Sequence, residues 1–337
     1  MKIALDVMGG DNAPKSNILG VKKFLKNNPT LDLEIILVGD KSLINEQLKI
    51  NNMSDENKIE VYHASDIISM DEPKPSLAFK NKPDSSIVKC IQLVKDQKAD
   101  AVISAGNTAA LLSSSLFVLG KIEGIKRPTL ASYFPSKKGG FVLSDVGANT
   151  DVKPFHILQF AIMASVYAKY IKKIDSPKVG LLNIGTEKNK GNNLTQSSFE
   201  FLEKNIEGFV GNIEPRYIFD KNIDVVLCDG FTGNVILKLT EGLIKYFQDW
   251  MSSNEIIKNN TEILDIINSI LDNYNYEEHG ASPFLGVKGI VLKCHGACSE
   301  VSIENSLKIA HVFCKEQLIM KIQNDLMNNA SLTINLD

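Results

Sequence analysis

The sequence is poor in cysteine, with five among 337 residues. An odd number of cysteines scattered along a long chain is not typical of a disulfide framework, and it favours reduced thiols in a cytoplasmic protein. Two of them flank a histidine in Cys294-His295-Gly296-Ala297-Cys298. A structural zinc ion usually takes four ligands in two pairs. Because no second pair is present, we interpret this segment as small buried residues and expect no metal.

Charge of one sign and long apolar runs are also lacking. The 37 Lys and Arg nearly balance the 40 Asp and Glu, so the net charge is -3 and no basic field favours nucleic acid. Asp6 interrupts the apolar start that a signal peptide would need. The uncharged stretch Ala101 to Gly120 is about long enough for a bilayer. Its serines, Asn107 and Gly106 favour a buried strand, a turn and a buried helix instead.

Common catalytic motifs are missing as well. The chain has no G-x-G-x-x-G after its first apolar run, no G-x-x-x-x-G-K-S/T, no G-x-S-x-G and no H-E-x-x-H. These absences disfavour an ordinary dehydrogenase, kinase or esterase. No organic cofactor is expected.

What the sequence does contain is a recurring unit of apolar run, Gly/Asn/Asp turn and helical segment. The runs lie at residues 2–6, 34–38, 101–104, 141–145, 179–183 and 224–228. Strands that are apolar throughout suit a parallel sheet covered on both faces, with helical crossovers between strands. The sequence therefore predicts an α/β fold with a doubly wound, mostly parallel sheet, in a single domain over residues 1–337.

One region, residues 235–271, departs from this alternation. Its first half places Ile236, Leu239, Leu243, Phe247 and Trp250 near one helical face, and its second half sets isoleucines at 263, 266, 267 and 270. We predict a protruding helical hairpin inserted in the domain. An apolar stripe this regular must be covered, so the hairpin is a candidate dimer or membrane contact.

The turns after the strands are candidate anion-binding sites. Ligands of an open parallel sheet bind beyond the carboxyl ends of its strands, where helix N-termini present free N–H groups. The expected phosphate- or substrate-binding residues are Gly9, Gly10, Asp11, Gly106, Asn107, Thr108, Gly147, Asn149, Asn183, Gly185, Thr186, Asp229, Gly230, Thr232 and Gly233.

Two further residues could act on the substrate directly. Lys190 lies in a glycine-flanked loop that could fold over the strand ends, although a solvated lysine is the simpler interpretation. Asn234 closes the turn of residues 229–233 at a predicted helix start, where it could instead be an N-cap.

Five segments together resemble the PlsX family, phosphate acyltransferases that use acyl-carrier protein. They are residues 5–11, 103–108, 145–149, 180–185 and 229–234, and the likeness runs in order along essentially the whole chain. The chain departs from the family pattern in two places. Pro83 and Asp84 interrupt a run that is often basic, and Ala297 and Cys298 stand where the family often has serines.

The resemblance implies a homodimeric acyltransferase with a fold related to phosphotransacetylases. Such an enzyme forms acyl-phosphate from acyl-carrier protein and inorganic phosphate. Its product passes to a membrane acyltransferase that acylates glycerol 3-phosphate in phospholipid synthesis. The resemblance implies catalytic roles for Lys190 and Asn234. Together with the cysteines and the apolar hairpin, it leads us to expect a cytoplasmic protein that could bind peripherally at the inner face of the membrane.

This reaction explains the missing catalytic triad, since phosphate is largely ionised at neutral pH and needs no general base. Three alternatives stay open. One is a phosphotransacetylase that acts on short acyl-CoA, which has no need of a long apolar binding surface. Another is a thiolase-like enzyme with Cys228 or Cys294 as nucleophile. The third is a non-catalytic module that binds an acidic ligand or carrier protein.

Overall fold

The computed structural model describes residues 1–136, 139–220, 222–254, 260, 263 and 280–328. The chain divides into two compact units. Unit 1 comprises Met1–Pro128, Tyr170–Lys172 and the described residues of His279–Asp337, and unit 2 comprises Thr129–Lys169 and the described residues of Lys173–Glu278. The single domain with an inserted hairpin stays a prediction.

Unit 1 is built on a six-stranded sheet with the order β3 (Ile59–His63), β2 (Glu34–Gly39), β1 (Lys2–Asp6), β4 (Ala101–Ser104), β11 (Ile290–Lys293) and β10 (Ser282–Leu285). The neighbours are parallel except for the antiparallel β10–β11 pair. Every residue of β4 and β11 is buried, which explains why the first three residues of each strand are apolar.

Most helices of unit 1 follow one strand and lead to the next, whereas the last two follow β11. The helices are α1 (Lys15–Asn27), α2 (Lys41–Ile50), α3 (Ala78–Asn81), α4 (Ser86–Lys95), α5 (Thr108–Val118), α11 (Glu300–Lys315) and α12 (Leu318–Asn328), with a 3-10 turn at Pro75–Leu77. The predicted strand, turn and buried helix of residues 101–120 are confirmed as β4 and α5. Helix α1 packs closely on α11, with Gly20 at the contact.

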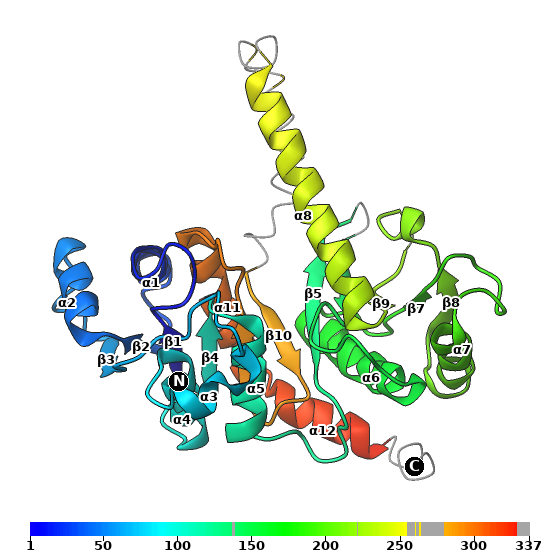
Figure 1. The fold of residues 1–337 in the computed structure, drawn as a ribbon, viewed down its shortest axis with the longest axis horizontal. Coiled ribbons are helices and arrows are strands. Elements are labelled where there is room, and N and C mark those ends of the chain that lie inside the picture. The colour runs from blue at the N-terminus through cyan, green and yellow to red at the C-terminus, as the bar shows by residue number, and fades with distance from the viewer. Residues whose placement is uncertain (137–138, 221, 255–259, 261–262, 264–279, 329–337) are drawn as a thin grey trace. The chain divides into compact units, whose positions relative to one another are not determined.

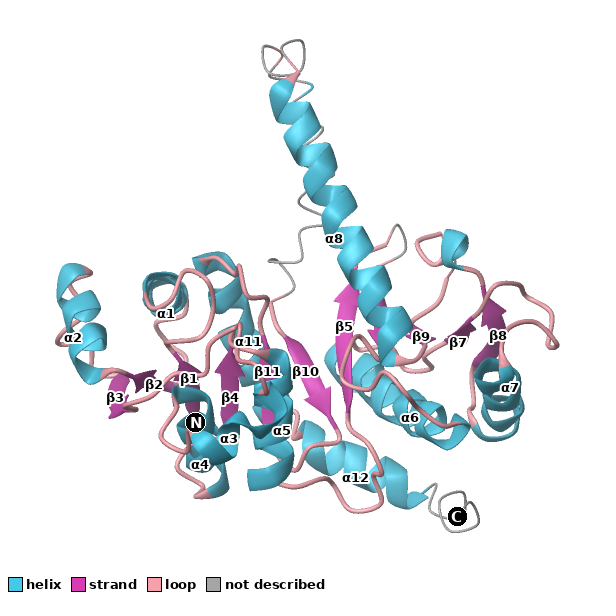
Figure 2. Cartoon of the chain, viewed as in Figure 1, coloured by secondary structure: helices cyan, strands magenta, loops and turns pink. Residues whose placement is uncertain are grey.

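Unit 2 repeats the plan with five strands in the order β5 (Thr129–Phe134), β6 (Phe141–Ser144), β9 (Val225–Leu227), β7 (Val179–Leu182) and β8 (Phe209–Ile213). Only β5–β6 is antiparallel. Its helices are α6 (Pro154–Ile171), α7 (Asn193–Asn205) and α8 (Gly230–Ser253), with a 3-10 turn at Pro215–Tyr217. The mostly parallel α/β fold is confirmed in both units (Figure 2).

Helix α8 is the first half of the predicted hairpin, but it begins at Gly230 rather than Val235. It extends away from the strands of its own unit (Figure 1). Seven of its large apolar side chains are exposed: Phe231, Val235, Leu239, Leu243, Tyr246, Phe247 and Trp250. Most of the second half lies outside the described residues. Within the described ranges, no helix is both long and apolar enough to cross a bilayer.

The α1–α11 contact yields a stability prediction. A Cβ added at Gly20 would lie 2.5 Å from Ile303 Cβ and 2.9 Å from the Glu300 carbonyl oxygen. We expect Gly20→Ala to lower the free energy of unfolding by about 1–3 kcal/mol, because overpacking outweighs the roughly 1 kcal/mol of helix propensity that alanine gains. Gly242→Ala is the control. Nothing lies within 4 Å of a Cβ added at Gly242, so this substitution should raise the free energy of unfolding. If urea unfolding showed that both substitutions change the free energy of unfolding in the same direction, the result would contradict this packing.

Candidate functional site

The turn after β6 is organised around the buried carboxylate of Asp145. Its Oδ1 accepts hydrogen bonds from the N–H groups of Gly147 (3.1 Å), Ala148 (3.0 Å) and Leu130 (3.2 Å). Its Oδ2 accepts from Asn149 twice, from the backbone N–H at 2.8 Å and from Nδ2 at 2.7 Å. Burial raises the pKa of Asp145, while these donated bonds act in the opposite direction.

This arrangement changes the expected role of the turn. The sequence predicts that the N–H groups of the Gly147–Asn149 turn face a phosphate. In the structure these N–H groups donate to the protein's own carboxylate at Asp145. A bound anion at this turn therefore has to rely mainly on side chains.

Helix α8 begins directly against the same turn. A Cβ at Gly230 would lie 2.5 Å from the Asn149 carbonyl oxygen, and one at Gly233 only 1.8 Å from the Asp145 carbonyl oxygen. The Gly230 N–H donates to the Asn149 carbonyl at 2.7 Å. These two glycines thus allow the helix start to touch the turn, which is a packing role that the sequence does not reveal.

Asp229, not Asn234, is the N-cap of α8. Asp229 Oδ1 accepts from the Thr232 N–H at 2.9 Å, and Oδ2 accepts from Thr232 Oγ1 at 2.8 Å. The interpretation of Asn234 as an N-cap is therefore wrong, because the helix starts four residues earlier. Asn234 is exposed in the second turn of α8, and a Cβ at Gly147 would lie 3.5 Å from its Oδ1. Its side-chain amide has no hydrogen-bond partner among the described residues and is exposed beside the Asp145 turn.

Lys190 lies in a loop that is firmly held at its backbone. Asn183, buried at the end of β7, donates from Nδ2 to the Lys190 carbonyl at 3.0 Å. Asn212 Nδ2 donates to the Glu187 carbonyl at 2.8 Å, and Gln196 Nε2 donates to the Asn189 carbonyl at 2.9 Å. The Lys190 side chain itself is half exposed, with Nζ 3.9 Å from a Glu187 carboxylate oxygen. The backbone is thus fixed while the ammonium group can move.

A cavity of about 420 Å³ lies within unit 2, beside the carboxyl ends of β7 and β9. Asn183, Gly191, Asp229 and Thr232 line it, whereas Lys190 and Asn234 do not. Most of the remaining lining is apolar and comes from α6, β7 and α7. The structure thus places several of the predicted site residues around one hollow, with the two predicted catalytic side chains outside its lining.

The predicted residues of unit 1 gather at the carboxyl ends of β1 and β4. Asp6 is fully buried and accepts from Ser104 Oγ at 2.6 Å, and burial raises the pKa of Asp6. Gly9 fits between these groups, since an added Cβ would lie 2.5 Å from Asp6 Oδ2 and 2.6 Å from the Gly106 nitrogen. Asn107 is the N-cap of α5 and accepts from the N–H groups of Ala109 and Ala110. Several of these residues therefore hold the local backbone together.

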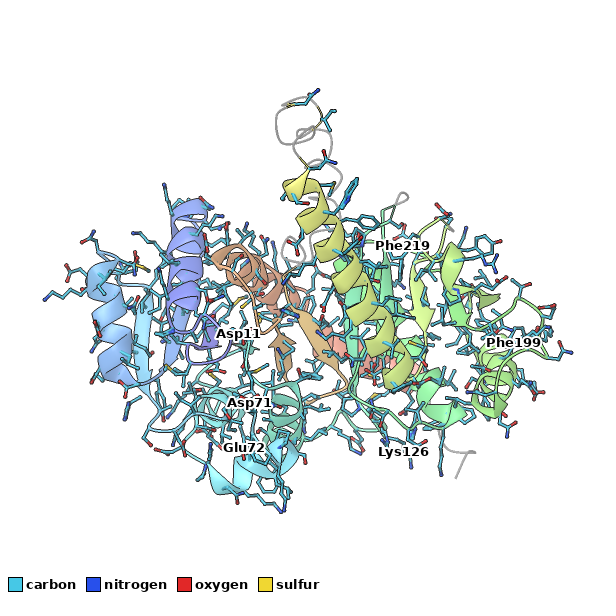
Figure 3. The ribbon with its side chains drawn as sticks, turned by 45° about the horizontal axis from the view of Figure 1, so that its top comes forward. Asp11, Asp71, Glu72, Lys126, Phe199 and Phe219 are labelled. Carbon is cyan, nitrogen blue, oxygen red and sulfur yellow. The ribbon has the colours of Figure 1, made fainter. Side chains whose placement is uncertain are left out.

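Asp11, labelled in Figure 3, belongs to the turn that follows β1. Its N–H donates to the Gly296 carbonyl at 2.8 Å, which ties the first turn of the chain to the segment after β11. Lys293 at the end of β11 is only 8% exposed, and its Nζ donates to the carbonyl oxygens of Ala105 and Cys294. Sequence reasoning missed this buried cation, because the strand of Lys293 was not predicted.

Cys228 and Cys294 do not have the surroundings of nucleophiles. Both are buried, and burial raises the pKa of each thiol. Reactive cysteines need a stabilised thiolate, so the thiolase-like alternative has no support from these sites. Across the described part of the chain, no group of three or more His, Cys, Asp or Glu side chains is arranged to hold a metal ion.

Comparisons with known proteins give relatives over the full length. The sequence profile of a family described as fatty acid synthesis protein matches residues 1–321. The chain is 42% identical over 333 residues to a phosphate acyltransferase of Desulforamulus reducens, covering 98% of each protein. It is 40% identical over 337 residues to a phosphate acyltransferase of Clostridium tetani, covering 98% of this chain and 100% of that one.

Solved structures agree on the fold. A phosphotransacetylase from Streptococcus pyogenes matches with a TM-score of 0.63 and 17% identity, covering 94% of each chain. A branched-chain phosphotransacylase from Enterococcus faecalis V583 matches with a TM-score of 0.59 and 16% identity, covering 93% of this chain and 99% of that one. At these identities the likeness concerns the fold alone.

The role of the Asp145 carboxylate in this turn can be tested by replacing one of its oxygens with an NH₂ group. Asp145→Asn puts an NH₂ group against N–H donors, and each donor left unsatisfied costs about 1–3 kcal/mol. We expect a fall of at least this size in the free energy of unfolding, measured by denaturant titration. Asp249→Asn, on the exposed side of α8, is the matched control and should change stability little. Equal stability of the two variants would show that the carboxylate does not organise this turn.

Proposed function

The chain belongs to the family of fatty acid synthesis proteins that includes the phosphate acyltransferases, and on this premise we propose that residues at the strand ends of unit 2 carry out its reaction. The chain is an acyltransferase that transfers an acyl group to inorganic phosphate for phospholipid synthesis. The acyl donor is acyl-carrier protein. The match over nearly the whole chain at about 40% identity carries the assignment of this activity, and the proposed site in unit 2 rests on the exposed Lys190 and Asn234.

The proposed mechanism needs orientation and charge rather than a base. Phosphate, whose second pKa is near that of phosphoserine at about 6, is already an anion at neutral pH. It attacks the thioester carbonyl, the C–S bond breaks, and the thiolate, with a free pKa of about 8.5, leaves with little help. The enzyme has to hold phosphate against the carbonyl and stabilise the oxyanion.

Lys190 and Asn234 are proposed for these tasks. Lys190 offers a mobile cation on a fixed backbone, which suits the incoming phosphate. The exposed Asn234 amide, beside Gly147, suits the thioester carbonyl oxygen as it gains charge. The glycine, asparagine, threonine and aspartate positions predicted from the sequence stay proposed as substrate contacts, and several of them act by shaping the backbone.

The activity test is direct. Purified protein is incubated with acyl-carrier protein charged with a fatty acid and with radiolabelled phosphate, and acyl-phosphate is scored. Short acyl-CoA is offered in parallel. Labelled product with the carrier-protein donor supports the proposal. Product with short acyl-CoA alone would favour the phosphotransacetylase alternative, which at present rests only on fold. No product with either donor would support the non-catalytic module.

The two proposed catalytic side chains give a second prediction. Lys190→Ala and Asn234→Ala should each lower kcat/KM about 10²–10³-fold, the usual loss when one contact to the oxyanion is removed. Lys188→Ala is the matched control, since Lys188 lies in the same loop and contacts Glu203. Near-normal turnover of both test variants, with circular dichroism unchanged, would refute these roles while leaving the reaction itself untouched.

The exposed face of α8 is proposed as an association surface. A contiguous stripe of seven large apolar side chains, each at least 47% exposed, is unusual for a surface that meets only water. We assign its start to contact within a homodimer and its far end, around Trp250, to peripheral contact with the inner face of the membrane. There a membrane acyltransferase acting on glycerol 3-phosphate can collect the apolar product.

Polar substitution at the far end separates these two roles. Phe247→Ser combined with Trp250→Ser should abolish co-sedimentation with anionic liposomes while dimer mass and turnover in solution persist. Gln248→Ser, on the neighbouring exposed position, should bind liposomes like the unmodified protein. Dissociation of the dimer in the double variant would assign the whole face to subunit packing. Failure of the unmodified protein to bind liposomes would refute the membrane contact. The tip residues Ile256 and Ile257 lie outside the described residues.

A further inference from the structure

The cavity of unit 2 has the character of an alkyl-chain pocket. Ile157 of α6, Leu181 of β7, Leu194 of α7 and Pro215 contribute apolar walls, and the volume of about 420 Å³ is within the range of ligand pockets. Ile184, two residues after the end of β7, also lines it and is 79% exposed. An apolar side chain left so exposed beside a hollow favours a ligand that is itself apolar.

Apart from the Ser198 hydroxyl, the following polar side chains of the lining are bonded within the protein. Asn183 donates to the Lys190 carbonyl and accepts from the Ile184 N–H. Asp229 and Thr232 are bonded to each other, and Asn192 accepts from the Thr195 N–H as the N-cap of α7. A polar ligand arm would therefore find few free partners here. An alkyl chain needs no hydrogen-bond partner.

Helix α7 provides the wall that sets how much of the cavity is open. Phe199 packs against Phe209 of β8 with ring centroids 5.2 Å apart, which anchors the helix (Figure 3). The adjacent Ser198 is fully buried, lines the cavity and has a hydroxyl with no hydrogen-bond partner among the described residues. A larger side chain at this position would extend into the cavity.

We infer that this cavity receives the hydrocarbon chain of the acyl substrate, and that Ser198 and Leu194 help to set the acyl-chain length the enzyme prefers. The inference rests on the proposed function and adds a specificity determinant to it. Burial of each methylene contributes about 0.8 kcal/mol, which is about a fourfold change in binding. A substitution that removes space for two or three methylenes should thus change the preference for long over short acyl chains by about 15- to 60-fold.

The test is the ratio of kcat/KM for hexadecanoyl and octanoyl acyl-carrier protein in the phosphate-dependent reaction. Ser198→Leu should lower this long-to-short ratio about 15- to 60-fold, because the added isobutyl group takes up room in the cavity. Ser197→Leu is the matched control, since the neighbouring Ser197 is exposed and outside the lining. Its ratio should equal that of the unmodified protein.

A second variant with the opposite sign covers the case in which Ser198→Leu fails to fold. Leu194 is half-buried in the cavity wall, and Leu194→Ala opens it, so the ratio should rise. An unchanged ratio in both folded variants would overturn the inference. An equal loss with both donors would also overturn it, because it would place the donor's prosthetic arm in the cavity. If the unmodified protein forms no acyl-phosphate with either donor, the proposed function fails instead.

Discussion

The contact between the first turn of α8 and the turn after β6 is the constraint on which unit 2 depends. The Asp145 carboxylate gathers the N–H groups of its own turn, and Gly230 and Gly233 let the helix meet that turn. Any side chain at Gly233 would collide with the Asp145 carbonyl oxygen, 1.8 Å from an added Cβ. Asn234 owes its position beside Gly147 to this approach.

The same use of polar side chains to hold the protein's own backbone recurs at several strand ends. Side chains that sequence patterns present as ligands for an anion mostly bind the protein's own backbone: Asp229 and Asn107 cap helices, and Asn183 holds the 183–191 loop. Such internal bonds remove conformational freedom before a substrate arrives, which is what a reaction governed by positioning requires. Lys190 and Asn234 are exposed, and they are the groups that we propose contact the substrate.

Much of the fold could be predicted from local patterns. The runs at residues 2–6 and 101–104 coincide with β1 and β4, because a strand buried on both faces must be apolar throughout. The strands that were missed have weaker patterns. Residues 59–63, 129–134 and 209–213 mix apolar residues with polar residues or glycine. Residues 282–285 contain Pro283, and residues 290–293 end in Lys293. With the last of these the buried Lys293 was missed as well.

By itself the sequence determined the α/β class, the order of the strand-end turns and the family, since apolar periodicity and ordered motifs are local properties. Only the tertiary structure decided what each turn residue does. Whether an N–H group faces a ligand or a carboxylate such as Asp145 depends on contacts between distant segments. The cavity lined by Ser198 likewise arises from α6, α7 and two strand ends brought together, so no single stretch of sequence encodes it.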